Sequence, residues 1–134
     1  MKPGPSLNTA RIRHGCTRTR DDSIIVAGGS KNSGLKSTEI LKIGQLEWTK
    51  GPDLKEEVQK NELVHSNGGE YIAYSVGGHT GGYYDHAWHE GVSDKIYGLQ
   101  RDRNEWQLVD RMNTPRQWGS ALNIPSSLVP WCQI

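Results

Sequence analysis

Residues 23–29 read Ser-Ile-Ile-Val-Ala-Gly-Gly, and residues 71–78 read Tyr-Ile-Ala-Tyr-Ser-Val-Gly-Gly. Both stretches are runs of β-branched, small and aromatic residues that end in a glycine pair, and the two pairs lie 49 residues apart. Such runs favour buried strands. A strand that must stop and turn at a crowded place needs residues with no Cβ and free φ, which both glycine pairs supply. The pattern predicts that the chain is built from a repeated group of strands.

Three further elements recur in the same order. Gly4-Pro5-Ser6-Leu7 recurs as Gly51-Pro52-Asp53-Leu54, Ser37-Thr38-Glu39-Ile40 as Ser93-Asp94-Lys95-Ile96, and Glu47-Trp48 as Glu105-Trp106, at offsets of 47, 56 and 58 residues. The offset therefore grows by 7 residues between the glycine pair and the third element and by 2 more before the tryptophan. Insertions between matched elements are typical of loops in a repeat protein.

Each copy is predicted to form four short strands. The first copy has strands at 13–18, 23–27, 37–43 and 47–50, and the second at 61–66, 71–76, 93–99 and 105–109. Turn-forming residues separate them, among them Asp21-Asp22, Asn67-Gly68-Gly69 and residues 101–104. The sequence predicts an all-β fold.

Composition limits the function classes. Only 34% of the 134 residues are hydrophobic, 16 are glycine, and the net charge is +1 with both signs mixed along the chain. A balanced charge gives no field that would attract nucleic acid or an anionic membrane. The sequence has no apolar run of membrane-spanning length and no signal peptide. Cys16 and Cys132 are the only cysteines, and we expect two reduced thiols in a cytoplasmic protein.

A unit of about 50 residues, in which an apolar strand ends in Gly-Gly and a tryptophan follows 20–30 residues later, resembles the kelch repeat, the blade of a β-propeller. The resemblance spans residues 4–124 and is carried by Arg11, His14-Gly15-Cys16, Gly28, Gly29 and Trp48 in the first copy and by Gly77, Gly78, Ile96-Tyr97 and Trp106 in the second. It implies an all-β partial β-propeller with about two four-stranded antiparallel kelch blades and the start of a third. Blade one would span 8–50, blade two 55–110 with a long loop at 79–92, and residues 115–134 would form an incomplete third unit and tail.

The sequence departs from the kelch pattern at two places. The arginine that opens a unit is absent from residues 56–60, and the third unit, which begins at Pro115-Arg116, has no glycine pair. Propellers close with 4–8 blades. The chain is therefore expected to be a piece of a longer protein, to close a ring by association with itself or with further kelch blades, or to be a truncated relict with no independent function.

The resemblance also directs attention to candidate partner-binding residues. Segments between blades and loops between second and third strands line one end of a kelch ring, where arginines can clamp an acidic peptide. The candidates are Arg11, Arg13 and Arg116 at the unit starts, and His79, Tyr83, Tyr84, His86, Trp88 and His89 in the long loop. Aromatic residues supply contact area at low entropic cost. The alternative for the arginines is a structural hydrogen bond between blades, and for the loop a packed surface segment.

No catalytic, metal or cofactor site is predicted. His86 and His89 have the spacing of two metal ligands but lack a third at a diagnostic position. Trp48 and Trp106, like the two glycine pairs, are expected to be structural. The expected function is a protein–protein interaction module, and the resemblance extends it to the substrate-recognition propeller of a BTB-kelch ubiquitin-ligase adaptor, although no BTB-like segment exists here. The alternative is a fragment of a propeller enzyme of the metal oxidase or epimerase type.

Overall fold

The computed structural model describes residues 3–80, 82–84, 87–89, 91–117 and 119, and within these ranges the chain forms strands and turns only. The first sheet has the order β1 (Gly15–Arg18), β2 (Ser23–Ala27), β3 (Thr38–Lys42) and β4 (Thr49–Lys50). The second has the order β5 (Glu62–His65), β6 (Tyr71–Val76), β9 (Lys95–Gln100) and β10 (Glu105–Arg111). All pairings are antiparallel. The all-β prediction is confirmed, and each of the eight predicted strands overlaps an observed one.

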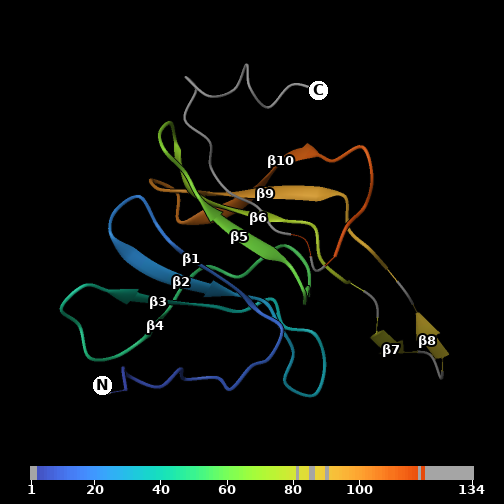
Figure 1. Cartoon of the computed structure of the whole chain (residues 1–134), viewed down its shortest axis with the longest axis horizontal. Coiled ribbons are helices and arrows are strands. Elements are labelled where there is room, and N and C mark those ends of the chain that lie inside the picture. The colour runs from blue at the N-terminus through green and yellow to red at the C-terminus, as the bar shows by residue number, and fades with distance from the viewer. Residues whose placement is uncertain (1–2, 81, 85–86, 90, 118, 120–134) are drawn as a thin grey trace.

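A third, two-stranded sheet interrupts the second. It consists of β7 (Gly82–Tyr84) and β8 (Ala87–His89), and it lies between β6 and β9 in the chain. Figure 1 shows the two four-stranded sheets stacked on each other, with this hairpin standing clear of both. The described residues contain no helix that is long and apolar enough to cross a bilayer.

The repeat is visible in the main-chain hydrogen bonds as well as in the sequence. Three bonds around the first glycine pair have counterparts around the second, with nearly the same lengths. The N–H of Gly28 donates to the Ser37 carbonyl (3.1 Å), as that of Gly77 does to Lys95 (3.0 Å). The N–H of Leu35 donates to the Gly29 carbonyl, as that of Ser93 does to Gly78 (2.8 Å each). The N–H of Val58 donates to the Leu35 carbonyl (3.1 Å), as that of Arg116 does to Ser93 (3.0 Å). The glycine φ angles agree too: 70° and 91° in the first pair, 61° and 112° in the second. The two copies therefore share one local conformation.

The register corrects one detail of the sequence alignment. Thr38 pairs with Ala27 at the end of β2, and Ile96 pairs with Val76 at the end of β6. The third strands are thus already offset by 58 residues, the same offset as the tryptophans, so the alignment of residues 37–40 with 93–96 was wrong by two. Similar polar residues suggested that alignment. The register of a strand is instead set by which of its side chains face the core. The whole insertion lies between β6 and β9, where the hairpin is.

The hydrophobic core draws on both sheets. Its fully buried members include Ile25 and Ala27 from β2, Leu99 from β9 and Trp106 from β10. The sheets come closest at β1 and β5, because a Cβ added at Gly15 would lie only 2.7 Å from Cγ of Leu63. A residue with no side chain is therefore required there for the sheets to pack.

Each tryptophan ties its sheet to the Gly-Pro segment that enters it. The indole Nε1–H of Trp106 donates to the Pro52 carbonyl at 3.0 Å, and that of Trp48 donates to the Pro5 carbonyl at 2.9 Å. Trp106 is fully buried between the sheets, whereas Trp48 is only half-buried, on the side of the first sheet that faces away from the second. The equivalent bonds support the structural role expected for both residues.

Candidate functional site

Four of the predicted partner-binding residues, Arg11, Arg13, His79 and Arg116, lie at one end of the sheets. We call this the glycine end, because β2 and β6 both finish there in the glycine pairs Gly28-Gly29 and Gly77-Gly78. The segments that lead from one sheet to the next, 51–61 and 112–117, reach the same end, as do the connections 28–37 and 77–94. The opposite end, the turn end, carries the tight turns at 19–22, 66–70 and 101–104.

Arg11 does not present its side chain to a partner. Its guanidinium is 0% exposed and donates to the carbonyls of Gly28 at 2.8 Å and Ser37 at 2.9 Å. It also forms an ion pair with the Glu39 carboxylate at 2.9 Å. All three partners belong to the first sheet or its own loop, so the side chain of Arg11 has a structural role within one sheet, and not the hydrogen bond between blades that was the alternative.

Arg13 lies at the junction of the two sheets with its side chain exposed. Its φ of 57° is in the left-handed region, and Lys60 in the second copy has φ 58°. The Arg13 carbonyl accepts a hydrogen bond from the Lys60 N–H at 2.7 Å, and its Nη1 donates to Oε1 of Gln59 at 3.4 Å. The junction holds the backbone of Arg13, while its exposed guanidinium remains accessible to a partner.

His79 forms the root of the hairpin. Its N–H donates to the Gln59 carbonyl at 2.7 Å, and its carbonyl accepts the Gln59 N–H at 3.0 Å. It also forms a bridge with Val92 on the other side. The imidazole is half-buried, and among the described residues its Nδ1 has no hydrogen-bond partner. His79 therefore anchors the hairpin to the segment between the sheets.

Arg116 docks onto the second sheet through its main chain. Its N–H donates to the Ser93 carbonyl at 3.0 Å, and its carbonyl accepts the Gly78 N–H at 2.7 Å. Val58 accepts from Gly29 in the same way, also at 2.7 Å, at the first glycine pair. The residue as a whole is exposed at the glycine end. Val58 itself, at the position where the second copy lacks an arginine, is buried in the core.

The hairpin holds the other candidates. Tyr83 pairs with Trp88, Tyr84 with Ala87 and Gly82 with His89, while His86 lies outside the described residues. The sequence predicted a loop at 79–92 and missed these strands, although three-residue runs with aromatics on either side of Asp85-His86 are a short hairpin signal. In the described ranges, no three or more His, Cys, Asp or Glu side chains are close enough to hold a metal ion.

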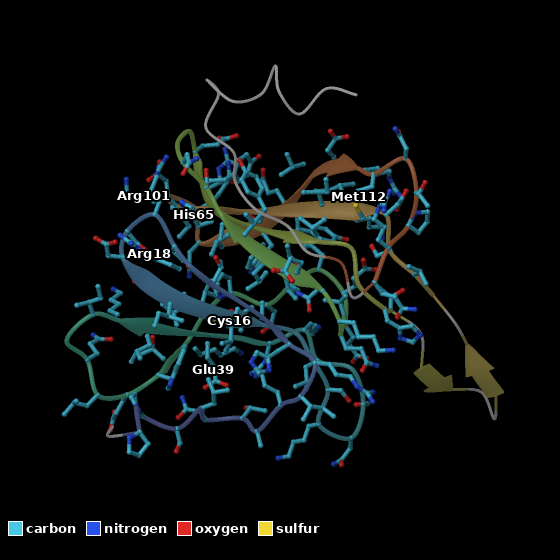
Figure 2. The ribbon with its side chains drawn as sticks, viewed as in Figure 1. Cys16, Arg18, Glu39, His65, Arg101 and Met112 are labelled. Carbon is cyan, nitrogen blue, oxygen red and sulfur yellow. The ribbon has the colours of Figure 1, made fainter. Side chains whose placement is uncertain are left out.

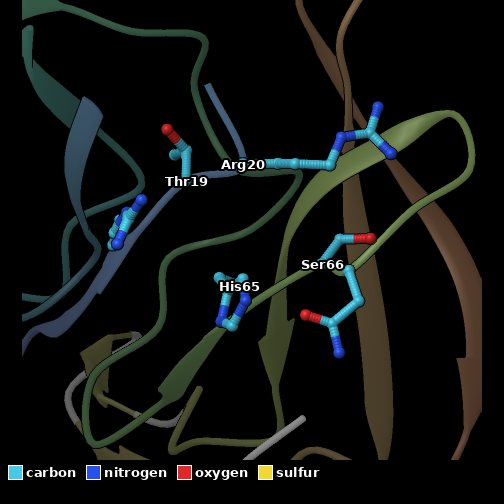
Figure 3. A pocket seen from close by; sticks show the side chains of 6 residues that line it. Thr19, Arg20, His65 and Ser66 are labelled. Carbon is cyan, nitrogen blue, oxygen red and sulfur yellow. The ribbon is translucent and has the colours of Figure 1, made fainter. Parts of the chain in front are cut away.

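A pocket at the turn end was not predicted at all. It has a volume of about 260 Å³ and is lined by Arg18, Thr19, Arg20, His65, Ser66 and Asn67 (Figure 3). Arg18 is the last residue of β1, and Thr19 and Arg20 follow it. His65 is the last residue of β5, and Ser66 and Asn67 follow it. The pocket therefore exists only because β1 and β5 lie side by side. Nothing in the local sequence around either turn could have revealed it.

Cys16 lies on β1, an edge strand of the first sheet (Figure 2). It is not in a disulfide, and the residue is classed as exposed, yet partial burial of the thiol raises its pKa. A raised pKa disfavours the thiolate form of Cys16. Cys132 lies outside the described residues.

Together these features define an all-β protein built from two copies of one four-stranded antiparallel unit. No family model matches the chain, and no curated protein matches it either.

Proposed function

We propose that the two sheets are consecutive blades of a kelch-type β-propeller and that the chain is a protein–protein interaction module. The order of the four strands in each sheet, the glycine pair after the second strand and the tryptophan in or beside the fourth agree with that reading. The main chain of Arg116 meets the second glycine pair as that of Val58 meets the first, which supports a third unit that begins at this point.

The outer faces of both sheets support further blades. In β2, Ile25 and Ala27 are buried against the second sheet, whereas on the other face Ile24 is 41% exposed and Val26 is buried. In β6, Ala73 and Ser75 are buried, and Tyr74 and Val76 on the opposite face are only half-buried. Apolar residues on both faces of a strand are typical of a sheet packed on two sides. We expect additional blades, in a longer chain or in an associated one, on these faces.

The hairpin β7–β8 is the observation that carries the binding proposal. It projects from the connection between β6 and β9, away from both sheets (Figure 1). Its sequence is rich in tyrosine, tryptophan and histidine, which are enriched where proteins recognise one another. Its root, at His79, lies at the glycine end together with Arg13 and Arg116. We propose that these residues recognise a segment of a partner protein, in a cytoplasmic setting such as a ubiquitin-ligase adaptor, without catalysis or a cofactor.

Selection of binders from a displayed peptide library on the full chain tests this proposal. We expect peptides to be recovered and to bind the wild-type chain in fluorescence anisotropy. Replacement of residues 81–90 by a Gly-Ser segment of equal length should weaken binding at least about tenfold, because hot-spot aromatics carry most of the binding energy. The matched control is Ile43→Ser with Leu46→Ser, since both side chains are exposed (79% and 84%) at the other end of the first sheet.

Circular dichroism with a thermal melt accompanies both variants. A cooperative melt in each would show that the sheets are intact. Equal peptide affinity of the wild type and the hairpin replacement, or loss of affinity in the Ile43/Leu46 control, would contradict the proposed site.

A further inference from the structure

The pocket at the turn end is lined by side chains with hydrogen-bond donors on both sides of the junction between the sheets. Arg18 and Arg20 come from the end of β1 and the turn after it, and His65 comes from the end of β5 (Figure 3). None of the six lining residues is acidic. The pocket is therefore a concentration of hydrogen-bond donors that would suit an anionic group.

Only one of the two arginines has an acidic partner. Arg18 forms an ion pair with Asp22, but both side chains are largely exposed (73% and 55%). Exposed pairs of this kind contribute little and exchange readily with water or another anion. For Arg20 no carboxylate partner is found in the part of the chain that the structure describes. Arg20 can thus offer its guanidinium to a ligand.

The turn after β5 leaves room for such a ligand beside Arg20. Gly68 has no side chain, and a Cβ added there would meet only Nη1 of Arg20, at 4.0 Å. The turn itself is held by the Ser66 hydroxyl, which donates to the Gly68 carbonyl at 2.7 Å. The Arg20 main chain is fixed across the junction, because its N–H donates to the Ile72 carbonyl at 3.3 Å. The guanidinium therefore lies beside an open, well-defined turn.

We infer that this pocket binds a carboxylate of an acidic protein segment, held by the guanidinium of Arg20 with assistance from Arg18 and His65. The planar guanidinium matches the two oxygens of a carboxylate. The lining offers no tyrosine, tryptophan or phenylalanine ring on which a base could stack, and the net charge of +1 gives no field for a polyanion. The site is at the opposite end of the sheets from the hairpin, and it does not depend on the proposed function of that element.

Gly68 provides an unusually direct test. In Gly68→Asp the new carboxylate would sit beside Arg20 and compete with a bound ligand, whereas Gly68→Asn has the same shape without the charge. Neither substitution needs a left-handed backbone, and the Cβ that both introduce has only Nη1 of Arg20 within 4 Å. We expect Gly68→Asp and Arg20→Gln each to weaken the ligand about tenfold, and Gly68→Asn to leave it unchanged.

The probes are two short synthetic peptides titrated into the full chain and followed by NMR shifts of the backbone amides. One has four glutamates with an amidated C-terminus, and the other has four glutamines with a free C-terminal carboxylate. Shifts at residues 18–20 and 65–68 with the first peptide assign the site to side-chain carboxylates, and with the second to a chain terminus. Inorganic phosphate is the third probe.

Three results would overturn the inference. The first is that neither peptide shifts these residues at millimolar concentration. The second is that Gly68→Asn weakens binding as much as Gly68→Asp does, and the third is that phosphate binds more tightly than either peptide. Because the hairpin replacement leaves residues 18–20 and 65–68 untouched, its effect on library peptides is independent of all three.

Discussion

The guanidinium of Arg11 and the carboxylate of Glu39 form an ion pair at 2.9 Å in which neither side chain is more than 5% exposed. The same carboxylate accepts the main-chain N–H groups of Asn8 at 2.6 Å and Thr9 at 3.1 Å. Glu39 thereby ties the segment before β1 to the middle of the first sheet, and Arg11 ties it to the glycine end.

Removal of one partner of this ion pair should destabilise the folded chain. Arg11→Val leaves a buried carboxylate without its counter-ion, and we expect a loss of about 3–5 kcal/mol in the free energy of unfolding. The second copy has Val58 and Tyr97 at the positions equivalent to Arg11 and Glu39, so Arg11→Val with Glu39→Tyr imports a combination that the fold already accommodates. Urea denaturation should show that the double variant is more stable than Arg11→Val alone. A double variant that loses the sum of both single losses would mean that the pair acts through other partners.

The second glycine pair should tolerate no side chain. A Cβ at Gly78 would lie 2.4 Å from Cγ2 of Val58 and 2.9 Å from the Gln59 carbonyl, and its φ is +112°. Gly44 has φ +84° but nothing within 4 Å. Gly44→Ala should therefore cost only backbone strain, about 1–2 kcal/mol, and Gly78→Ala roughly 2–6 kcal/mol, because steric overlap adds to the strain. Chemical denaturation of both variants measures the difference. Equal losses would show that the close approach at Gly78 relaxes without cost.

The two tryptophans should differ in their contribution to stability although their hydrogen bonds are equivalent. Trp106 is fully buried, and Trp106→Ala should destabilise the chain by about 3–5 kcal/mol through the cavity that it leaves. Trp48 is half-buried, so Trp48→Ala should cost clearly less. Unfolding followed by far-UV circular dichroism avoids the change in fluorescence that either substitution causes. If Trp48→Ala proved the more damaging, the first sheet would have to depend on its outer face more than on the shared core.

His14 should make stability depend on pH. Burial, and next the nearby positive charge of Arg11, lower the pKa of its imidazole below the ordinary value of 6.5. The unfolded chain therefore takes up a proton at a higher pH than the folded chain does. The stability that the folded chain has with His14 neutral is lost as the pH falls below about 6.5. In His14→Gln the urea midpoint should fall less between pH 7.5 and pH 5 than in the wild type. Parallel pH profiles would mean that His14 titrates alike in both states.

Much of the fold could be predicted from the sequence because its signals are local. The apolar runs of β2 and β6, the glycine pairs and the tryptophans each report on their own strand, and all eight strands of the two sheets lie close to the predicted positions. The alignment of the third strands was wrong, since it rested on similar polar residues rather than on the pairing of Thr38 with Ala27 and Ile96 with Val76.

The candidate sites were less accessible to sequence reasoning. Arg11 matches a binding arginine in residue type, but only the fold shows that Glu39, 28 residues away, encloses its charge. The pocket of Arg20 and His65 depends on the side-by-side placement of β1 and β5, which no local pattern encodes. Conversely, the aromatic content of residues 83–89 was recognised, but not the hairpin that presents it.

The joint between the units has a consequence for how such a chain can change. Gly29 donates to the carbonyl of Val58, which precedes the second sheet, and Gly78 donates to the carbonyl of Arg116, which follows that sheet. Two residues as different as these make the same bond at the same length, because only main-chain atoms take part. The bond itself is thus indifferent to the side chain, and the same main-chain joint can form between units of different sequence.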